Sequence, residues 1–189
     1  MACGVPDRGK LFVNMKGREN AISSRWHKTI TEKKIAFKNG KGGLINNTEI
    51  LVRSDGREEV VKAGKIVVAT GSVPIPAPSM PFDGETILSP DDVIALREIP
   101  ENILIVGGDR IGCELATLFN RRGSKVFMCD ENPHIVAEQD PDIIAAVENE
   151  MKKQKIKLLL NRKPVSIYKE GGKVDVTLEG EIKFSTDKI

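Results

Sequence analysis

Short apolar runs alternate with helical spacings of apolar residues in the second half of the chain. The runs lie at 103–106, 125–129 and 156–160, and the segments between them carry apolar residues at i, i+3 and i+4. This alternation predicts a parallel sheet with right-handed crossovers and with helices on its faces. Further short β segments are predicted at 165–168, 174–178 and 182–184, and we expect the segments within 174–184 to form a small antiparallel β meander beside that sheet.

The first part of the chain has a different pattern. Residues 14–34 are polar with widely spaced apolar positions, which predicts a moderately amphipathic helix. Short β segments are predicted at 35–37 and 48–52, with turn dipeptides such as Asp55-Gly56 in the same region. The run at 65–71 has the pattern of a buried strand that ends in a glycine turn. We therefore expect short strands separated by turns in this part of the chain.

A proline-rich stretch separates the two patterns. Four prolines between residues 73 and 84 exclude regular structure, which is typical of a linker. Ser89 and Pro90 then predict the start of a short helix, because serine caps helices and proline fits the first helical position. The chain is therefore divided into segments 1–75, 76–100 and 101–189.

The first apolar run of the second half leads into a glycine turn with a known spacing. Gly107 and Gly112 flank this turn, and the next apolar run ends at Asp130, twenty-three residues after Gly107. A strand, a glycine turn and a helix form the dinucleotide-binding fingerprint, whose acidic residue meets the ribose hydroxyls of NAD. Asp130 and its neighbour Glu131 would repel a 2′-phosphate, so NAD is favoured over NADP. The alternative is an ordinary buried strand, turn and helix that binds no ligand.

One position departs from this fingerprint. Asp109 stands where glycine normally lets the backbone approach the pyrophosphate. Its side chain and negative charge would oppose a phosphate, and its carboxylate could bond the same helix amides as a built-in anion. Arg110 would offset part of this repulsion. We therefore expect NAD to bind weakly, if it binds at all.

Composition and cysteine content mainly exclude particular partners and sites. The 29 basic and 27 acidic residues give a net charge of +2, so no nucleic-acid partner is predicted. No apolar run is long enough to span a bilayer and no apolar signal segment is present, so we expect a cytoplasmic protein without membrane association. Cys3, Cys113 and Cys129 lack metal-ligand spacing, and no metal site is predicted. We expect Cys113 and Cys129 to be core residues and Cys3 to be an exposed thiol.

Three motifs together resemble one known family. They are Val67-Val68-Ala69-Thr70-Gly71-Ser72-Val73-Pro74, the fingerprint from Gly107 to Glu114, and Asp140-Pro141-Asp142-Ile143. In order and spacing they are similar to the flavin- and NAD-dependent pyridine nucleotide-disulfide oxidoreductases, over residues 10–189. The resemblance implies an α/β protein with a Rossmann-like NAD-binding domain at 101–189. It also implies that 1–75 form a partial, β-rich, FAD-domain-like segment of antiparallel strands. This segment lacks the family's first βαβ element, so we expect its edges to be open, poorly ordered or paired with a neighbouring chain.

The resemblance also assigns roles to individual residues. It implies that the turn at Ala69, Thr70 and Gly71 approaches FAD. It implies that Glu114 lies near the contact of nicotinamide with flavin and that Val165 lies beside adenine. The candidate NAD-binding residues are Gly107, Gly108, Asp109, Arg110, Ile111, Glu114, Asp130, Glu131 and Val165.

Other family features have no counterpart in this sequence. The family has a first glycine fingerprint for FAD, a Cys-x4-Cys redox pair and a C-terminal domain that supplies a histidine base. The likeness therefore implies the central portion of a flavin-dependent disulfide oxidoreductase, and we expect no catalytic residue and no disulfide reductase activity in this chain alone. The alternatives are a non-catalytic nucleotide-binding or regulatory module with a degenerate phosphate site, and a fold without a ligand. The expected partners are a nucleotide cofactor and a second copy paired through open sheet edges.

Overall fold

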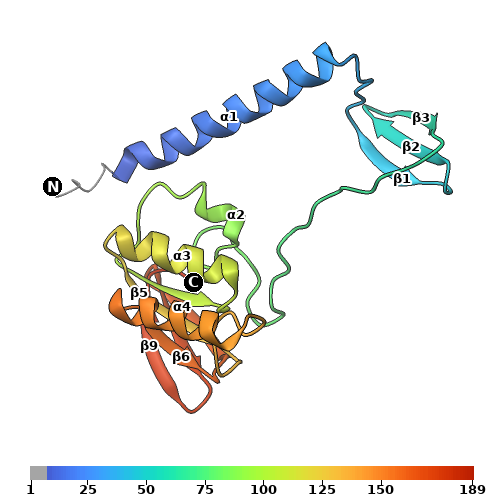
Figure 1. Ribbon diagram of the computed structural model, residues 1–189. Coiled ribbons are helices and arrows are strands. Elements are labelled where there is room, and N and C mark those ends of the chain that lie inside the picture. Colours follow the sequence, from blue (N-terminus) through green and yellow to red (C-terminus); the bar gives the residue numbers. More distant parts are fainter. Residues whose placement is uncertain (1–7) are drawn as a thin grey trace. The chain divides into compact units, whose positions relative to one another are not determined.

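The computed structural model describes residues 8–189, with side chains from residue 17 onward. It divides into two compact units, one formed by Lys16–Val73 and one that contains Pro74–Ile189. The first unit holds one sheet of three strands and the second unit holds two such sheets (Figure 1). Each unit is described separately below.

The first unit combines a long helix with a small antiparallel sheet. Helix α1 (Arg8–Glu32) is followed by β1 (Lys41–Leu44), β2 (Glu49–Ser54) and β3 (Arg57–Lys62), which pair in the order β1-β2-β3. Asp55 and Gly56 join β2 to β3 with φ angles of 47° and 75°, the geometry of a two-residue hairpin turn. The predicted helix and the antiparallel sheet are therefore confirmed. No helix in the described part of the chain is long and apolar enough to cross a membrane.

Two strands predicted in this unit are wrong. Residues 35–37 and 65–71 have no regular structure, and the side chains of Val67 and Val68 are 88% and 66% exposed. A buried strand needs a hydrogen-bonded neighbour, and no described segment supplies one to 65–71. Strands β1 and β3 were missed because their sequences, KGGL and REEVVK, are rich in glycine or charge.

The second unit has the α/β order that the sequence predicts. Its elements are α2 (Pro90–Val93), β4 (Asn102–Val106), α3 (Arg110–Arg121), β5 (Lys125–Asp130), α4 (Pro141–Lys153), β6 (Lys157–Leu160), β7 (Pro164–Glu170), β8 (Lys173–Leu178) and β9 (Ile182–Thr186). Strands β4, β5 and β6 pair in parallel, and β7, β8 and β9 form the antiparallel meander. The predicted fold class is confirmed.

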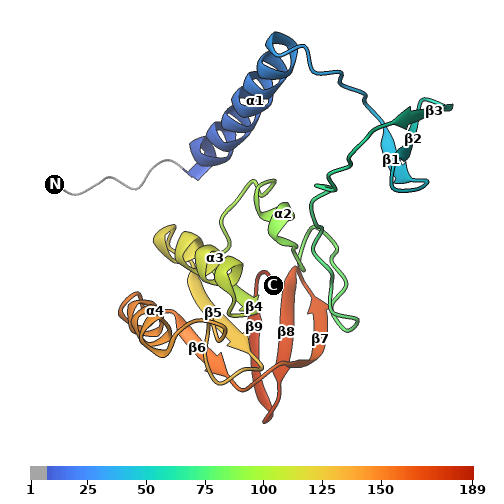
Figure 2. The same cartoon turned by 45° about the vertical axis from the view of Figure 1, so that its right-hand side comes forward.

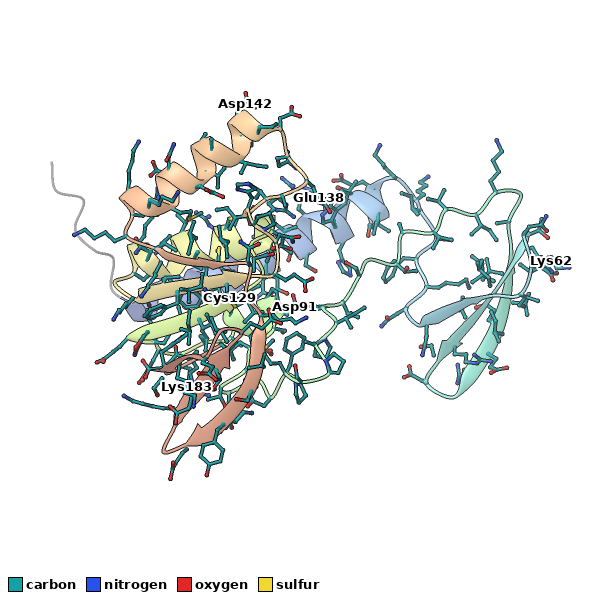
Figure 3. All side chains as sticks on the ribbon, turned by 90° about the horizontal axis from the view of Figure 1, so that it is seen from below. Lys62, Asp91, Cys129, Glu138, Asp142 and Lys183 are labelled. Carbon is teal, nitrogen blue, oxygen red and sulfur yellow. The ribbon has the colours of Figure 1, made fainter. Side chains whose placement is uncertain are left out.

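The parallel sheet lies between a helical layer and the meander (Figure 2). Along β4, Ile103 and Ile105 pack against the core that contains α3 and α4, while Leu104 packs against the meander. Along β5, Met128 and Cys129 face these two sides in the same way. Cys129 lies between the layers (Figure 3). Because both faces are covered, these strands have continuous apolar runs rather than an apolar–polar alternation.

Residues 187–189 extend the parallel sheet beyond β4. The Leu104 N–H donates to the Lys188 carbonyl at 3.0 Å, in a parallel pairing. On the other side, the Leu88 N–H donates to the Ile189 carbonyl at 2.7 Å. This segment therefore lies between β4 and the end of the proline-rich linker.

Asp83 anchors that linker to the meander. Its Oδ1 accepts hydrogen bonds from the backbone N–H groups of Glu85 (2.9 Å), Thr86 (2.8 Å) and Ile87 (2.8 Å). Its Oδ2 accepts from the Thr86 hydroxyl and from the Lys169 ammonium on β7. Burial would raise the pKa of Asp83, but the Lys169 ammonium and the backbone amides outweigh it and hold the pKa well below its usual range. The linker has no helix or strand, as predicted, but its end is fixed.

Helix α2 begins at the predicted cap. The Asp92 N–H donates to Ser89 Oγ at 3.3 Å, and the Ser89 N–H donates to Asp92 Oδ2 at 2.8 Å. This reciprocal pair is a capping box, and Pro90 occupies the first helical turn.

Candidate dinucleotide-binding site

The turn between β4 and α3 requires its glycines for backbone reasons. Gly107 has a φ of +108°, which L side chains rarely adopt. A Cβ on Gly108 would lie 2.6 Å from Ile135 Cγ2, and a Cβ on Gly112 would lie 2.0 Å from the Gly107 carbonyl oxygen. The tight turn at Gly107 and the close packing of helix on strand at Gly112 are the backbone roles that the sequence predicts.

Asp109 needs no such freedom, because its backbone is ordinary. Its φ of −73° and ψ of −175° are extended and open to any residue. The residue caps α3, and its Oδ1 accepts a hydrogen bond from the Gly112 N–H at 2.8 Å. An anionic group of the chain itself therefore occupies part of the positive end of the helix.

Asp130 lies at the end of β5 and contacts the same turn. Its Oδ2 accepts from the Gly108 N–H at 2.5 Å, and its Oδ1 accepts from the Asn132 N–H at 2.7 Å. The side chain is half-buried, and each carboxylate oxygen retains capacity for another hydrogen bond. The carboxyl ends of two adjacent parallel strands thus bring an acid and a glycine turn together, as a dinucleotide site requires.

The loop between β5 and α4 covers the turn. Ile135 is fully buried near Gly108, and the Val136 N–H donates to the Gly108 carbonyl at 2.7 Å. Val136 has a φ of +46°, an unfavourable backbone conformation for a β-branched residue. His134 Nδ1 lies 3.0 Å from Glu148 Oε1 and connects the loop to α4. The sequence analysis missed this loop; its signal was a pair of apolar residues, Ile135 and Val136, in an otherwise polar segment.

The other candidate residues lie at the exposed margin of the turn. Arg110 and Glu114 form an ion pair on α3, with Arg110 Nη1 2.9 Å from Glu114 Oε1. Ile111 and Glu131 are exposed, and Val165 on β7 is 53% exposed. Hydrogen bonds and close approaches join the residues at the centre, namely Gly107, Gly108, Asp109, Gly112 and Asp130. Within residues 17–189, the structure gives Glu131 no side-chain hydrogen bond to that group.

The turn predicted to approach FAD lies in the first unit. Ala69, Thr70 and Gly71 are exposed and have no regular structure. Gly71 has a φ of +73°, a backbone conformation that favours glycine. Among the described residues, no hydrogen bond links Ala69, Thr70 or Gly71 to another segment.

Two cysteines lie in the core of the second unit. The Cys113 thiol lies 3.7 Å from the Gly108 carbonyl, and Cys129 is fully buried. Burial, with added repulsion from Asp109 and Asp130, raises the pKa of Cys113 to about 11. Burial and then Asp130 raise the pKa of Cys129 to about 12. The prediction that both are core residues is confirmed, while Cys3 lies outside the described residues.

These pKa values predict slow thiol chemistry. With Cys3 replaced by serine, we expect Cys113 and Cys129 to react with an aromatic disulfide at pH 8 at least about 100-fold more slowly than after unfolding in urea. Only the thiolate reacts, and a pKa of about 11 instead of about 9 lowers the thiolate fraction of Cys113 about 100-fold, with a larger effect for Cys129. The rate should keep rising with pH up to pH 10. A rate that levels off near pH 9 would contradict this prediction.

The parallel sheet, its glycine turn and the acid beside that turn have the arrangement of a Rossmann-type fold. The chain belongs to the pyridine nucleotide-disulphide oxidoreductase family, whose model matches residues 6–189. It is 35% identical over 156 residues to dihydrolipoyl dehydrogenase from Chlamydia trachomatis, and this match covers 82% of this chain and 33% of the relative. It is 34% identical over 119 residues to dihydrolipoyl dehydrogenase from Bacillus subtilis, covering 63% of this chain and 26% of the relative. The chain thus spans about a third or less of the length of these curated relatives.

Solved structures share the fold. LpdA from Mycobacterium tuberculosis superposes with a TM-score of 0.85 at 22% identity, over 96% of this chain and 41% of that one. The HOCl-induced flavoprotein disulfide reductase RclA from Escherichia coli gives 0.83 at 22% identity, over 97% of this chain and 42% of that one. The family model and the curated relatives confirm the family resemblance stated from the motifs.

Proposed function

We propose that this chain supplies the NAD-binding domain, and the adjoining part of the FAD domain, of a flavin-dependent disulfide oxidoreductase of the dihydrolipoyl dehydrogenase type. The contact between Asp130 Oδ2 and the Gly108 N–H carries the proposal, because it places a ribose-binding acid against a glycine turn. The names of the curated relatives support the same class of enzyme. In such an enzyme, bound FAD carries electrons between a disulfide and the nicotinamide.

The residues of this chain would bind and orient the nucleotide. Asp130 would accept hydrogen bonds from the ribose hydroxyls, and Glu131 would disfavour a 2′-phosphate, which supports NAD over NADP. Gly107 and Gly108 would approach the dinucleotide through their backbone. The family likeness supports outer positions for Glu114 near the nicotinamide and Val165 near adenine, and a flavin contact for the turn Ala69-Thr70-Gly71. We assign no catalytic residue.

The chain on its own is proposed to lack disulfide reductase activity. Disulfide exchange requires an accessible thiolate, and burial disfavours that form in both Cys113 and Cys129. The sequence contains no Cys-x4-Cys pair. The nearest alternative function is a non-catalytic nucleotide-binding or regulatory module, which the built-in anion at Asp109 favours.

Thermal unfolding with each nucleotide tests the proposed function. NAD and NADH should raise the midpoint slightly and NADP should not, because a ligand stabilises the folded state only by binding to it. Asp130→Ala should abolish the NAD effect. If no nucleotide raised the midpoint of either the unmodified chain or the Asp109→Gly variant, the proposal would be contradicted. A flavin spectrum that survives gel filtration would show that this chain holds FAD by itself.

Replacing Asp109 by glycine should tighten NAD binding at least about tenfold, or about 1.4 kcal/mol. The substitution removes both a side chain and a negative charge from the place where the pyrophosphate would approach the helix amides. Isothermal titration at matched ionic strength measures the change. Asp140→Gly is the matched control, because Asp140 caps α4 without a side-chain hydrogen bond. Equal NAD affinities of the Asp109→Gly variant and the unmodified chain would refute the prediction.

A second copy of the chain is the proposed protein partner. Strands β1 and β3 form the two edges of the sheet in the first unit, and open edges pair readily with other strands. Light scattering during size-exclusion chromatography should therefore show a dimer whose fraction rises with concentration. A monomer at every concentration would contradict this pairing.

A further inference from the structure

We propose that this site takes an uncharged nucleoside, held through its ribose diol, in preference to a phosphorylated nucleotide. The inference rests on the proposed function, because it names the ligand class of the same site. Four observations support it. The carboxylate of Asp109 binds a helix amide, backbone amides orient Asp130, Arg110 is paired with Glu114, and the residues around the turn carry more negative than positive charge.

Two carboxylates of the chain already bind amides of the turn where a phosphate would approach. The Gly112 N–H, at the start of α3, donates to Asp109 Oδ1 at 2.8 Å. The Gly108 N–H, the next donor of the turn, is bound to Asp130 Oδ2. A pyrophosphate normally uses amides of such a turn and helix start. Here two of them already hold carboxylates.

The backbone at Asp109 shows that the glycine of the fingerprint is not needed for the fold. With a φ of −73°, this position accepts any residue. The usual glycine there serves the close approach of a phosphate. A charged side chain at this position is therefore compatible with the fold, where it caps α3, and it changes what the turn can bind.

By contrast, Asp130 keeps the position from which the acid of the fingerprint binds the two ribose hydroxyls. Two backbone amides, of Gly108 and Asn132, fix both oxygens of the Asp130 carboxylate. Each oxygen can accept one more hydrogen bond, and two vicinal hydroxyls supply two donors. This half of the site therefore favours hydroxyl groups over negatively charged groups.

The charges around the turn act in the same direction. Arg110 is the cation of the motif, and its guanidinium is paired with Glu114 at 2.9 Å. Asp109, Asp130 and the exposed Glu131 add further negative charge at the end of the sheet. A diphosphate would meet this field, whereas an uncharged nucleoside would not.

Titration of the full chain with adenosine and with ADP-ribose tests the inference, because ADP-ribose adds only a diphosphate and a second ribose to the same nucleoside. The unmodified chain should bind adenosine at least tenfold more tightly than ADP-ribose. Its affinity for 2′-deoxyadenosine, which lacks one diol hydroxyl, should be at least tenfold lower than for adenosine. Higher salt should narrow the gap between adenosine and ADP-ribose, because it screens the repulsion.

Two variants separate charge from bulk. Asp109→Gly should strengthen ADP-ribose binding at least tenfold and change adenosine binding less than twofold. Asp109→Asn should give an intermediate gain for ADP-ribose, because it removes the charge and keeps the side chain. Circular dichroism verifies that both variants fold.

The outcomes distinguish this inference from the proposed function. If the unmodified chain binds ADP-ribose as tightly as adenosine, the preference for an uncharged ligand is overturned and nucleotide binding stands. The preference is likewise overturned, and nucleotide binding stands, if the Asp109→Gly variant binds ADP-ribose and the other two proteins bind neither ligand. If neither ligand binds any of the three proteins, both proposals are overturned.

Discussion

Replacing Gly112 by alanine lowers the free energy of unfolding of the second unit by about 3 kcal/mol. The added Cβ would lie 2.0 Å from the Gly107 carbonyl oxygen and 3.1 Å from its carbonyl carbon. Both are backbone atoms, and the pairing of β4 with β5 holds the end of this strand in place. Relief would require α3 to move away from the sheet, which would open the core around the fully buried Ala116.

Gly17→Ala in α1 is the matched control. It makes the same chemical change inside a helix, but a Cβ at Gly17 meets nothing within 4 Å. Helix propensity alone then predicts no loss and a gain of up to about 1 kcal/mol. Urea denaturation followed by circular dichroism measures both variants. A loss at Gly112 no larger than the change at Gly17 would show that the helix adjusts without cost.

Asp83→Ala lowers the free energy of unfolding by about 3 kcal/mol at pH 7, since it leaves several backbone amides and the Lys169 ammonium without their acceptor. The exposed Asp91 on α2 provides the control, and Asp91→Ala should change stability by less than about 0.5 kcal/mol. Urea denaturation at constant ionic strength measures both. Equal effects would show that water replaces the contacts of Asp83 without loss.

The same residue predicts a dependence on pH. The folded state lowers the pKa of Asp83, so its contribution is fully present above the ordinary pKa of about 4 and is lost as the pH falls below it. Asp83→Asn should therefore remove part of the acid destabilisation seen between pH 5 and pH 2. Its amide oxygen still accepts hydrogen bonds from the backbone, but it cannot pair with Lys169. An unchanged acid profile would contradict this assignment.

The sequence predicted the second unit well because its strands are buried on both faces. The positions Ile103, Leu104 and Ile105 are all apolar for that reason, and short apolar runs that alternate with helical patterns predict parallel strands. The fingerprint spacing located Asp130, which lies twenty-three residues after Gly107 and is the last residue of β5. The capping role of Asp109 was accessible from its position before a helical pattern.

The sequence could not predict features that depend on contacts between distant segments. The apolar run containing Val67 and Val68 has the composition of a buried strand, but strand formation requires a neighbour that no described residue provides. The partner of Asp83 lies 86 positions away, on β7, so the anchoring of the linker left no local signal. The positive φ of Val136 also had no local signal, because valine is not a turn-forming residue. Its backbone is hydrogen-bonded to Gly108, which is distant in the sequence.

The place of residues 187–189 between β4 and the linker has a consequence for synthesis on the ribosome. Asp187 accepts hydrogen bonds from the N–H and the side-chain amide of Asn102, which was made 85 positions earlier. A nascent chain that has reached only β6 would therefore leave one side of β4 unpaired and the Leu104 face of the sheet uncovered. Residues 187–189 must therefore emerge before both sides of β4 are paired, and chaperones that bind nascent apolar surface would meet the Leu104 face of the sheet before then.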